Sequence, residues 1–342
     1  MKKLLVYLKT YKKETILAPL FKMLEALFEL FVPLVIAAII DTGIENKDVP
    51  YIVRMAIVLV VLAIVGLTCS LTAQYFSAKA AVGFAAKLKS ALFAHIESLS
   101  FKEIDTLGTS TLITRMTSDI NQVQSGVNLV LRLFLRSPFI VFGAMIMAFT
   151  IDVKAALIFV VAIPLLAIVV FGIMLVSIPL FKKVQGALDS VLGITRQNLT
   201  GVRVIRAFNN EQSEIENFDE KNAVLTGLQK FVGKISALMN PVTFIIVNGA
   251  IAALIWVGAL RVDAGILSQG QVVALVNYMS QILVELVKLA NLIITVTKAV
   301  ACGNRIQSVF EIKSSMEEGS RRYSASSEDD YSIEFKNVNL CY

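Results

Sequence analysis

Long apolar runs alternate with polar segments along the whole chain. Six stretches hold roughly twenty or more mostly apolar residues each, at about 16–40, 52–76, 129–150, 153–178, 241–260 and 272–296. A helix needs ~20 such residues to cross a bilayer, and lipid offers no partner for backbone groups outside a helix. The pattern therefore predicts an all-α membrane protein with six transmembrane helices.

Two long polar segments, 77–128 and 179–240, separate the second stretch from the third and the fourth from the fifth. No proline occurs between Pro50 and Pro138 or between Pro179 and Pro241, so nothing there forces the chain out of a helix. In the first, apolar residues recur at spacings of three and four, the stripe of a helix packed on one side: Leu112, Met116, Ile120, Val123 and Val127. We expect helices that run on past the membrane, with ~20 residues reaching ~30 Å beyond it.

Each pair of extended helices has to turn at its tip, and the first tip contains residues that typically start and end helices. In "SLSFKEIDTLGTST", Ser100 and Glu103 have the spacing of a capping box, and Gly108 marks a stop. A short helix that includes Phe101 and Asp105 is therefore expected to lie across this tip.

The second tip, "NNEQSEIENF", has similar signals. Asn209 or Asn210 can begin a helix, and the acidic Glu211 and Glu214 suit its first turn. Apolar Ile215 and Phe218 follow. Short amphipathic helices at the ends of long stalks suit docking into a groove on another protein, and the alternative is that both tips are solvated turns.

Composition and charge support the membrane assignment. Hydrophobic residues make up 56% of the chain and charged residues only 17%, which excludes an ordinary soluble domain of this length. The N-terminal tail is rich in lysine, which places it, and the C-terminus after six spans, on the cytoplasmic side of the cell membrane: Lys2, Lys3, Lys9, Lys12 and Lys13. No metal-ligand spacing occurs, and His95 is expected to be an ordinary helix-surface residue.

Ionisable residues within the spans are the remaining chemical signal. Such groups cost at least ~2.5 kcal/mol each at the bilayer centre, so they usually face protein or a water-filled cavity. The residues that could line a substrate cavity are Glu25, Glu29, Arg132, Arg136 and Glu285. Structural pairing is the alternative, and the arginines lie where they could snorkel to the interface. An acidic cavity would favour cationic amphipathic compounds.

The tip sequences resemble a known family. The stretches "GTSTLITRMTSDINQVQ" and "RQNLTGVRVIRAFNNEQSEIENF", in a six-span unit, look like the intracellular loops of ATP-binding cassette (ABC) exporters of the bacterial multidrug type, over residues 1–300. Many members carry an acidic residue near Gln197 or Asn198, which this chain lacks. The resemblance implies a half-transporter that pairs with a second half, as a homodimer or heterodimer, and moves small amphipathic compounds or drugs out by alternating access. The tip helices would be coupling helices to nucleotide-binding domains.

The end of the chain fits the same resemblance. "SIEFKNVNLCY" at 332–342 alternates as a strand does, and in the family a linker, here 301–331, leads to a nucleotide-binding domain whose first strand ends in an aromatic that stacks on adenine. Tyr342 stands at the matching position, although a frayed tail is the alternative. The P-loop G-x-x-x-x-G-K-[ST] does not occur in the sequence, so no catalytic residue is assigned. ATP and Mg²⁺ are expected only through the missing domain.

Two other function classes stay open. A secondary transporter or channel could use intramembrane charges, but it would typically show broken helices and internal repeats. A non-transporting or truncated membrane subunit that only assembles with an intact partner is the second alternative. No feature indicates a nucleic-acid partner.

Overall fold

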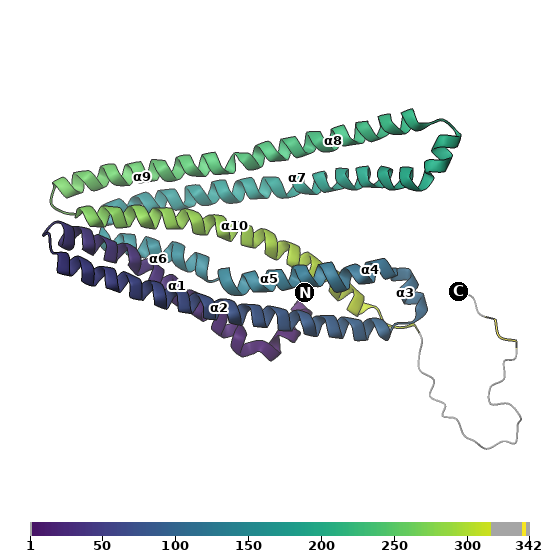
Figure 1. The fold of residues 1–342 in the computed structure, drawn as a ribbon, viewed down its shortest axis with the longest axis horizontal. Coiled ribbons are helices and arrows are strands. Elements are labelled where there is room, and N and C mark those ends of the chain that lie inside the picture. Colours follow the sequence, from purple (N-terminus) through teal and green to yellow (C-terminus); the bar gives the residue numbers. More distant parts are fainter. Residues whose placement is uncertain (1, 316–336, 340–342) are drawn as a thin grey trace, which may run out of the picture. The chain divides into compact units, whose positions relative to one another are not determined.

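The computed structural model of the chain describes residues 2–315 and 337–339, and within them every regular element is a helix (Figure 1). The α-helices are α1 (Lys12–Ala38), α2 (Val49–Glu97), α3 (Phe101–Leu107), α4 (Thr109–Thr114), α5 (Ile120–Leu133), α6 (Arg136–Ile151), α7 (Val153–Ala207), α8 (Glu211–Ala237), α9 (Met239–Asp263) and α10 (Gln269–Glu311). A 3-10 helix, η1 (Lys2–Tyr11), precedes them, and two π-helical turns, η2 (Ile39–Ile44) and η3 (Arg115–Asp119), lie between them. The predicted all-α class is confirmed.

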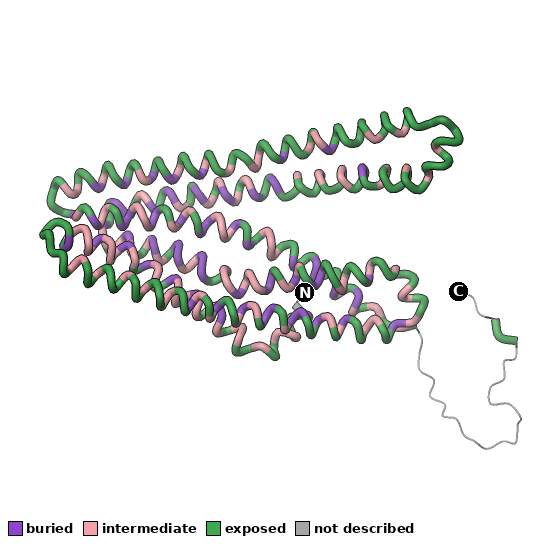
Figure 2. Tube along the Cα trace, viewed as in Figure 1, coloured by how far each residue is buried: buried purple, intermediate pink, exposed green. Residues whose placement is uncertain are grey.

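Six helical segments in the described part are long and apolar enough to cross a membrane, which confirms the six predicted spans. They are Lys3–Ile44, Val49–Glu97, Thr109–Ile151, Val153–Ala207, Glu211–Asp263 and Gln269–Glu311. The first half of α2 is mostly exposed (Figure 2). Its large apolar side chains, such as Val53, Ile57 and Leu67, are more than half exposed. Such a surface suits lipid and would be costly in water.

Several helices continue far beyond the length that a bilayer requires. Helix α2 has 49 residues and α7 has 55, so α7 is roughly 80 Å long at 1.5 Å per residue. Helix α8 runs beside α7 (Figure 1). Pro164 and Pro179 lie inside α7 without ending it. The predicted helical extensions are confirmed.

The third span is not one continuous helix. It breaks between α5 and α6, at Phe134 and Leu135, which directly precede the buried Arg136. Pro138 lies in the first turn of α6 and has no backbone N–H, so it cannot donate the bond that would continue the helix from Phe134. The break therefore starts a new helix at Arg136.

The chain divides into two compact units. The described part of the first comprises residues 2–17, 75–131 and 295–315, together with 337–339. Its core contains Phe84 and Leu88 of α2, Ile120 of α5 and Ile306 of α10, all fully buried. Gly126 of α5 meets this core so closely that an added Cβ would lie 2.3 Å from the Cβ of Ala299.

His95 belongs to the first unit and is not an ordinary surface residue as predicted. Its Nε2 lies 3.0 Å from the carbonyl oxygens of both Val309 and Ile312, and its ring packs against Phe310. His95 therefore joins α2 to the end of α10, a contact between residues more than two hundred positions apart that sequence periodicity does not reveal.

The second unit comprises residues 18–74 and 132–294. Its core joins α1, α6, α7, α9 and α10 through fully buried residues such as Phe159, Leu254 and Tyr278. The Tyr278 hydroxyl donates to the Leu30 carbonyl oxygen at 2.6 Å, which fixes α10 against α1. These contacts set the relative position of α1, α6 and α10, the helices that carry the intramembrane charges.

A carboxylate also holds one end of this unit. Asp41 of η2 accepts a hydrogen bond from the backbone N–H of Gly270 at 2.7 Å and one from the Ser268 hydroxyl. An anion at the start of α10 satisfies a free N–H and suits the helix dipole. Gly270 is required there, because a Cβ would lie 2.4 Å from the carbonyl oxygen of Ala37.

Candidate functional site

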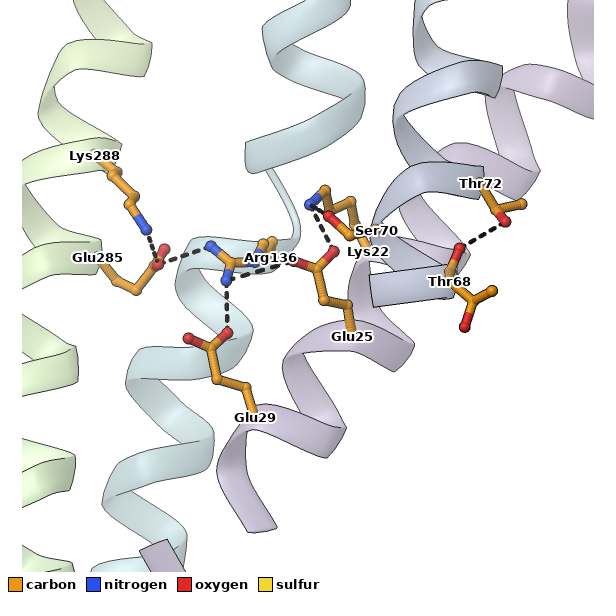
Figure 3. A network of polar contacts seen from close by, with 9 residues as sticks. All are labelled: Lys22, Glu25, Glu29, Thr68, Ser70, Thr72, Arg136, Glu285 and Lys288. Atoms are coloured by element: carbon orange, nitrogen blue, oxygen red, sulfur yellow. Dashed lines mark hydrogen bonds and ion pairs between the residues drawn. The ribbon is translucent and has the colours of Figure 1, made fainter. Parts of the chain in front are cut away.

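Three of the carboxylates predicted within the spans meet around one arginine in the second unit (Figure 3). Arg136 donates from Nη1 to Glu285 Oε1 at 2.8 Å and from Nη2 to Glu29 Oε2 at 2.6 Å. Glu25 Oε1 lies 3.9 Å from the same Nη2. One guanidinium at the start of α6 therefore joins α1 to α10.

Two lysines and two hydroxyls complete this ion-pair network. Lys22 Nζ donates to Glu25 at 2.5 Å and to Ser70 of α2 at 3.1 Å. At the other end, Lys288 Nζ donates to Glu285 Oε1 and the Ser137 hydroxyl donates to Glu285 Oε2, both at 2.8 Å. Glu285, which is 3% exposed, thus holds hydrogen bonds from three side chains.

The charges of the network balance, because three acidic and three basic side chains take part. Burying an ion costs several kcal/mol, and attraction to a partner offsets this only when the remaining lone pairs also find donors. Arg136 and Lys22 are buried like Glu285, whereas the side chains of Glu29 and Lys288 are each 41% exposed. The network is thus closed at its centre and accessible at two charges of opposite sign.

A pocket of about 320 Å³ opens beside these two charges. It is lined by Glu29, Val32, Pro33 and Ile36 of α1, Ile140 of α6, and Asn277, Ser280, Gln281, Val284, Glu285 and Lys288 of α10. Gln281 contributes a buried Oε1 that has no hydrogen-bond partner among the described residues. Apolar walls with a few converging polar groups are the usual composition of a small-molecule site.

At the first tip, Ser100 precedes α3 with an extended backbone, as a residue before a helix should. Its hydroxyl does not cap a backbone N–H and instead donates to the Glu103 carboxylate, so the predicted capping box is wrong in its bonding although the helix forms. Hydrogen bonds from Ser100 and then Ser315 lower the pKa of Glu103 to about 2. Phe101 is 75% exposed, and Asp105 is exposed as well.

At the second tip, Asn210 immediately precedes α8, but its side chain caps no backbone N–H. The predicted tip residues Glu211, Glu214, Ile215 and Phe218 form the first turns of α8, which continues to Ala237 as a single helix. A groove of about 450 Å³ lies here, lined by Thr195, Asn198, Leu199, Val202, Ile205, Arg206, Glu211, Glu214, Ile215 and Phe218.

The first unit also contains a buried carboxylate, Asp119, which no sequence motif marks. Asp119 accepts two bonds from Arg305, at 2.5 Å to Oδ1 and 3.0 Å to Oδ2, and one from Arg115 at 2.9 Å. Burial alone would raise the pKa of Asp119, but hydrogen bonds from Arg305, then from the Cys302 thiol and Arg115, outweigh it and hold this pKa below its usual value. The bonds join the η3 turn to α10 outside the apolar stretches.

Comparison with known proteins decides the family. The family described as "ABC transporter transmembrane region" matches residues 15–286. The chain belongs to the ABC transporter transmembrane family. It is similar to an uncharacterized ABC transporter ATP-binding protein of Mycobacterium bovis, 30% identical over 89% of this chain and 52% of the relative. It is also similar to the uncharacterized ABC transporter ATP-binding protein YfiB of Bacillus subtilis, with 29% identity over 100% of this chain and 59% of the relative.

A more distant relative carries a functional name. The ATP-dependent lipid A-core flippase of Desulfotalea psychrophila is 28% identical over 68% of this chain and 41% of its own length. The chain thus spans only about half the length of the curated relatives it matches. The family match covers the transmembrane region, and it confirms the resemblance to ABC exporters that the sequence indicates.

The structure gathers most of the predicted cavity residues of this ABC transmembrane domain but not all. Arg132 has no ion pair with a described residue, and its Nε is buried without a hydrogen-bond partner there. Arg136 does not snorkel, because it is buried and paired with Glu285 and Glu29.

Several lining residues were not selected from the sequence. The polar members of α10 recur on one face of an otherwise apolar stretch, a signal that could have found them: Asn277, Ser280 and Gln281. Ser137 lies next to Arg136, but its bond to Glu285 depends on how α6 packs against α10. Tyr342 lies outside the described residues.

Proposed function

We propose that this domain is the membrane half of an ATP-driven exporter that moves small amphipathic compounds or drugs outward by alternating access. It would pair with a second half-transporter in the cell membrane, with both termini in the cytoplasm. Nucleotide-binding domains, outside the described residues, would bind ATP and Mg²⁺. The observation that carries the proposal is the combination of six apolar spans with uninterrupted helical extensions that end in exposed tips.

The extensions suit the transmission of motion. Helix α7 continues from Val153 to Ala207 without a break, so a displacement at its tip reaches the apolar part of the same helix. The exposed side chains at the tips, among them Phe101 and Ile215, are available to a partner protein. Two arrangements of such rigid helices are enough to switch access from one side to the other. A channel or secondary transporter has no evident use for such long helical extensions.

The cavity would lie at the pocket beside the ion-pair network. Glu29 and Glu285 line this pocket directly, while Arg136 and Glu25 hold the network together behind it. In this proposal Arg132 lines the wider cavity. Helix α10 runs on to Glu311, so the linker would begin after this residue and extend to 331. Residues 332–342 would form the first strand of the nucleotide-binding domain, with Tyr342 stacking on adenine.

The test is to make one of the helical extensions, that of α7, more flexible. Two glycines inserted after Val202 of α7, in the product of the complete reading frame, should abolish drug-stimulated ATPase activity and export while basal ATPase activity remains. The matched control carries the same two glycines after Asn46, in the exposed turn between η2 and α2. Unchanged export with the Val202 insertion would refute the proposed coupling.

A further inference from the structure

Two charged side chains of the ion-pair network are accessible to a ligand, and their charges have opposite signs. Both charges line the pocket: the carboxylate of Glu29 on α1 and the ammonium of Lys288 on α10. Each side chain is 41% exposed, whereas those of Lys22, Arg136 and Glu285 are below 10% exposed. The accessible part of the site is therefore dipolar and not simply acidic.

This arrangement disfavours a simple organic cation. Glu285 already accepts hydrogen bonds from Arg136, Lys288 and Ser137, so a cation at this carboxylate would have to compete with fixed donors. It would also meet the positive charge of Lys288. A simple anion would meet the negative charge of Glu29 in the same way, because like charges at close range repel strongly in a medium of low dielectric constant.

A molecule that carries both charges can satisfy both side chains. Its anionic group would pair with Lys288 and its ammonium group with Glu29, without a net charge entering the membrane. The orphan Oε1 of Gln281 would accept a hydrogen bond from an ammonium N–H. The apolar walls, including Val32 and Ile36, leave room for the start of an alkyl chain.

We propose that the pocket between α1 and α10 binds a zwitterionic amphiphile, with a primary ammonium group and a phosphate or carboxylate group close together at the end of an apolar chain. This inference rests on the proposed function, because it names the substrate class of the same cavity. It replaces the cationic compounds that the acidic residues alone would favour.

The test uses three photoreactive probes that share one dodecyl chain with a diazirine and differ only in the headgroup: phosphoethanolamine, primary ammonium or phosphate. They are applied to the product of the complete reading frame in lipid nanodiscs, and labelled peptides are identified by mass spectrometry. The phosphoethanolamine probe should label residues 29–36 and 277–288 most strongly, and unlabelled zwitterion should compete for this labelling. Headgroup-dependent stimulation of ATPase activity is measured in parallel.

Two charge variants sharpen the test. Lys288→Met should lower labelling by the zwitterion roughly tenfold, equivalent to ~1.4 kcal/mol, and should make the ammonium probe the preferred one. Glu29→Gln should shift the preference toward the phosphate probe. Lys288→Met leaves Glu285 bound to Arg136 and Ser137, and thermal unfolding confirms that each variant is folded. The matched controls are Lys183→Met and Glu220→Gln, both at exposed positions outside the pocket.

The possible results separate the two claims. Preferred labelling of the pocket by the ammonium probe, or an unchanged preference in Lys288→Met, would overturn the zwitterion inference and leave the exporter proposal standing. If no probe labels the pocket but a drug still stimulates ATPase activity and is exported, the cavity lies elsewhere and the inference is wrong. If neither labelling nor stimulated ATPase activity occurs, the proposed function fails as well.

Discussion

Replacing Arg136 by methionine should destabilise the membrane domain more than any other single change in the ion-pair network. The substitution leaves Glu29 and Glu285 without their shared guanidinium, and Glu285 is 3% exposed. Removing one partner of a buried ion pair costs about 3–5 kcal/mol. Lys288 and Ser137 still bond Glu285, so we expect the lower end of that range, about 3 kcal/mol.

The assay is thermal unfolding of the full product in detergent micelles, followed by the reaction of a thiol-specific dye with the buried Cys69. A loss of ~3 kcal/mol corresponds to a fall in midpoint of roughly 6–12 °C for a cooperative unit of about 150–250 residues, the size range of the second unit. Arg203→Met, at an exposed position on α7, is the matched control and should change the midpoint little.

A second pair of variants tests the cause. Arg136→Met leaves three carboxylates against two lysines, and adding Glu285→Gln removes the excess buried negative charge, so the double variant should recover part of the lost stability. Two results would refute the reasoning that a buried ion pair holds α6 to α10. One is that the losses of unfolding free energy of the two single variants simply add in the double variant. The other is that Arg136→Met alone lowers the unfolding free energy by less than about 1 kcal/mol.

Two further predictions concern single residues. Gly270→Ala should cost about 1–3 kcal/mol of unfolding free energy because its Cβ would meet the Ala37 carbonyl oxygen at 2.4 Å, whereas Gly249→Ala, with open space around it, should not lower the midpoint. The pKa of Glu103 is about 2, so its contribution to the first tip is complete above its ordinary pKa of 4.5 and disappears as the pH falls through about 2. In Ser100→Ala, carboxyl NMR should find the Glu103 pKa closer to its ordinary value, and an unchanged pKa would contradict the assigned cause.

The spans and their extensions were predictable because they depend on local properties. Apolar length determines where a helix can cross a bilayer, and the lack of proline in 77–128 and 180–240 lets the helices continue. The break before Arg136 was harder to place. Pro138 was visible in the sequence, but proline does not end every helix, as Pro164 and Pro179 in α7 show.

The site itself was predictable only in part, since it depends on how helices pack. Glu25 and Glu29 share a helix face by spacing alone, but nothing in the sequence pairs Glu29 with a residue more than a hundred positions away on α6. The same spacing rules placed Arg132 and Arg136 together, and only Arg136 faces the network. The carboxylates alone predict an acidic cavity. In the structure they are paired with an equal number of basic side chains, so the charges of the network balance.

The central claim is tested most directly by transport with the product of the complete reading frame in inside-out vesicles. The account predicts that an amphiphilic substrate accumulates in the vesicles with ATP, and that neither a non-hydrolysable ATP analogue nor an ion gradient replaces ATP. Accumulation driven by an ion gradient without ATP would identify a secondary transporter. No accumulation under any condition, with ATPase activity unaffected by the chain, would indicate a passive subunit, and either result would contradict the account.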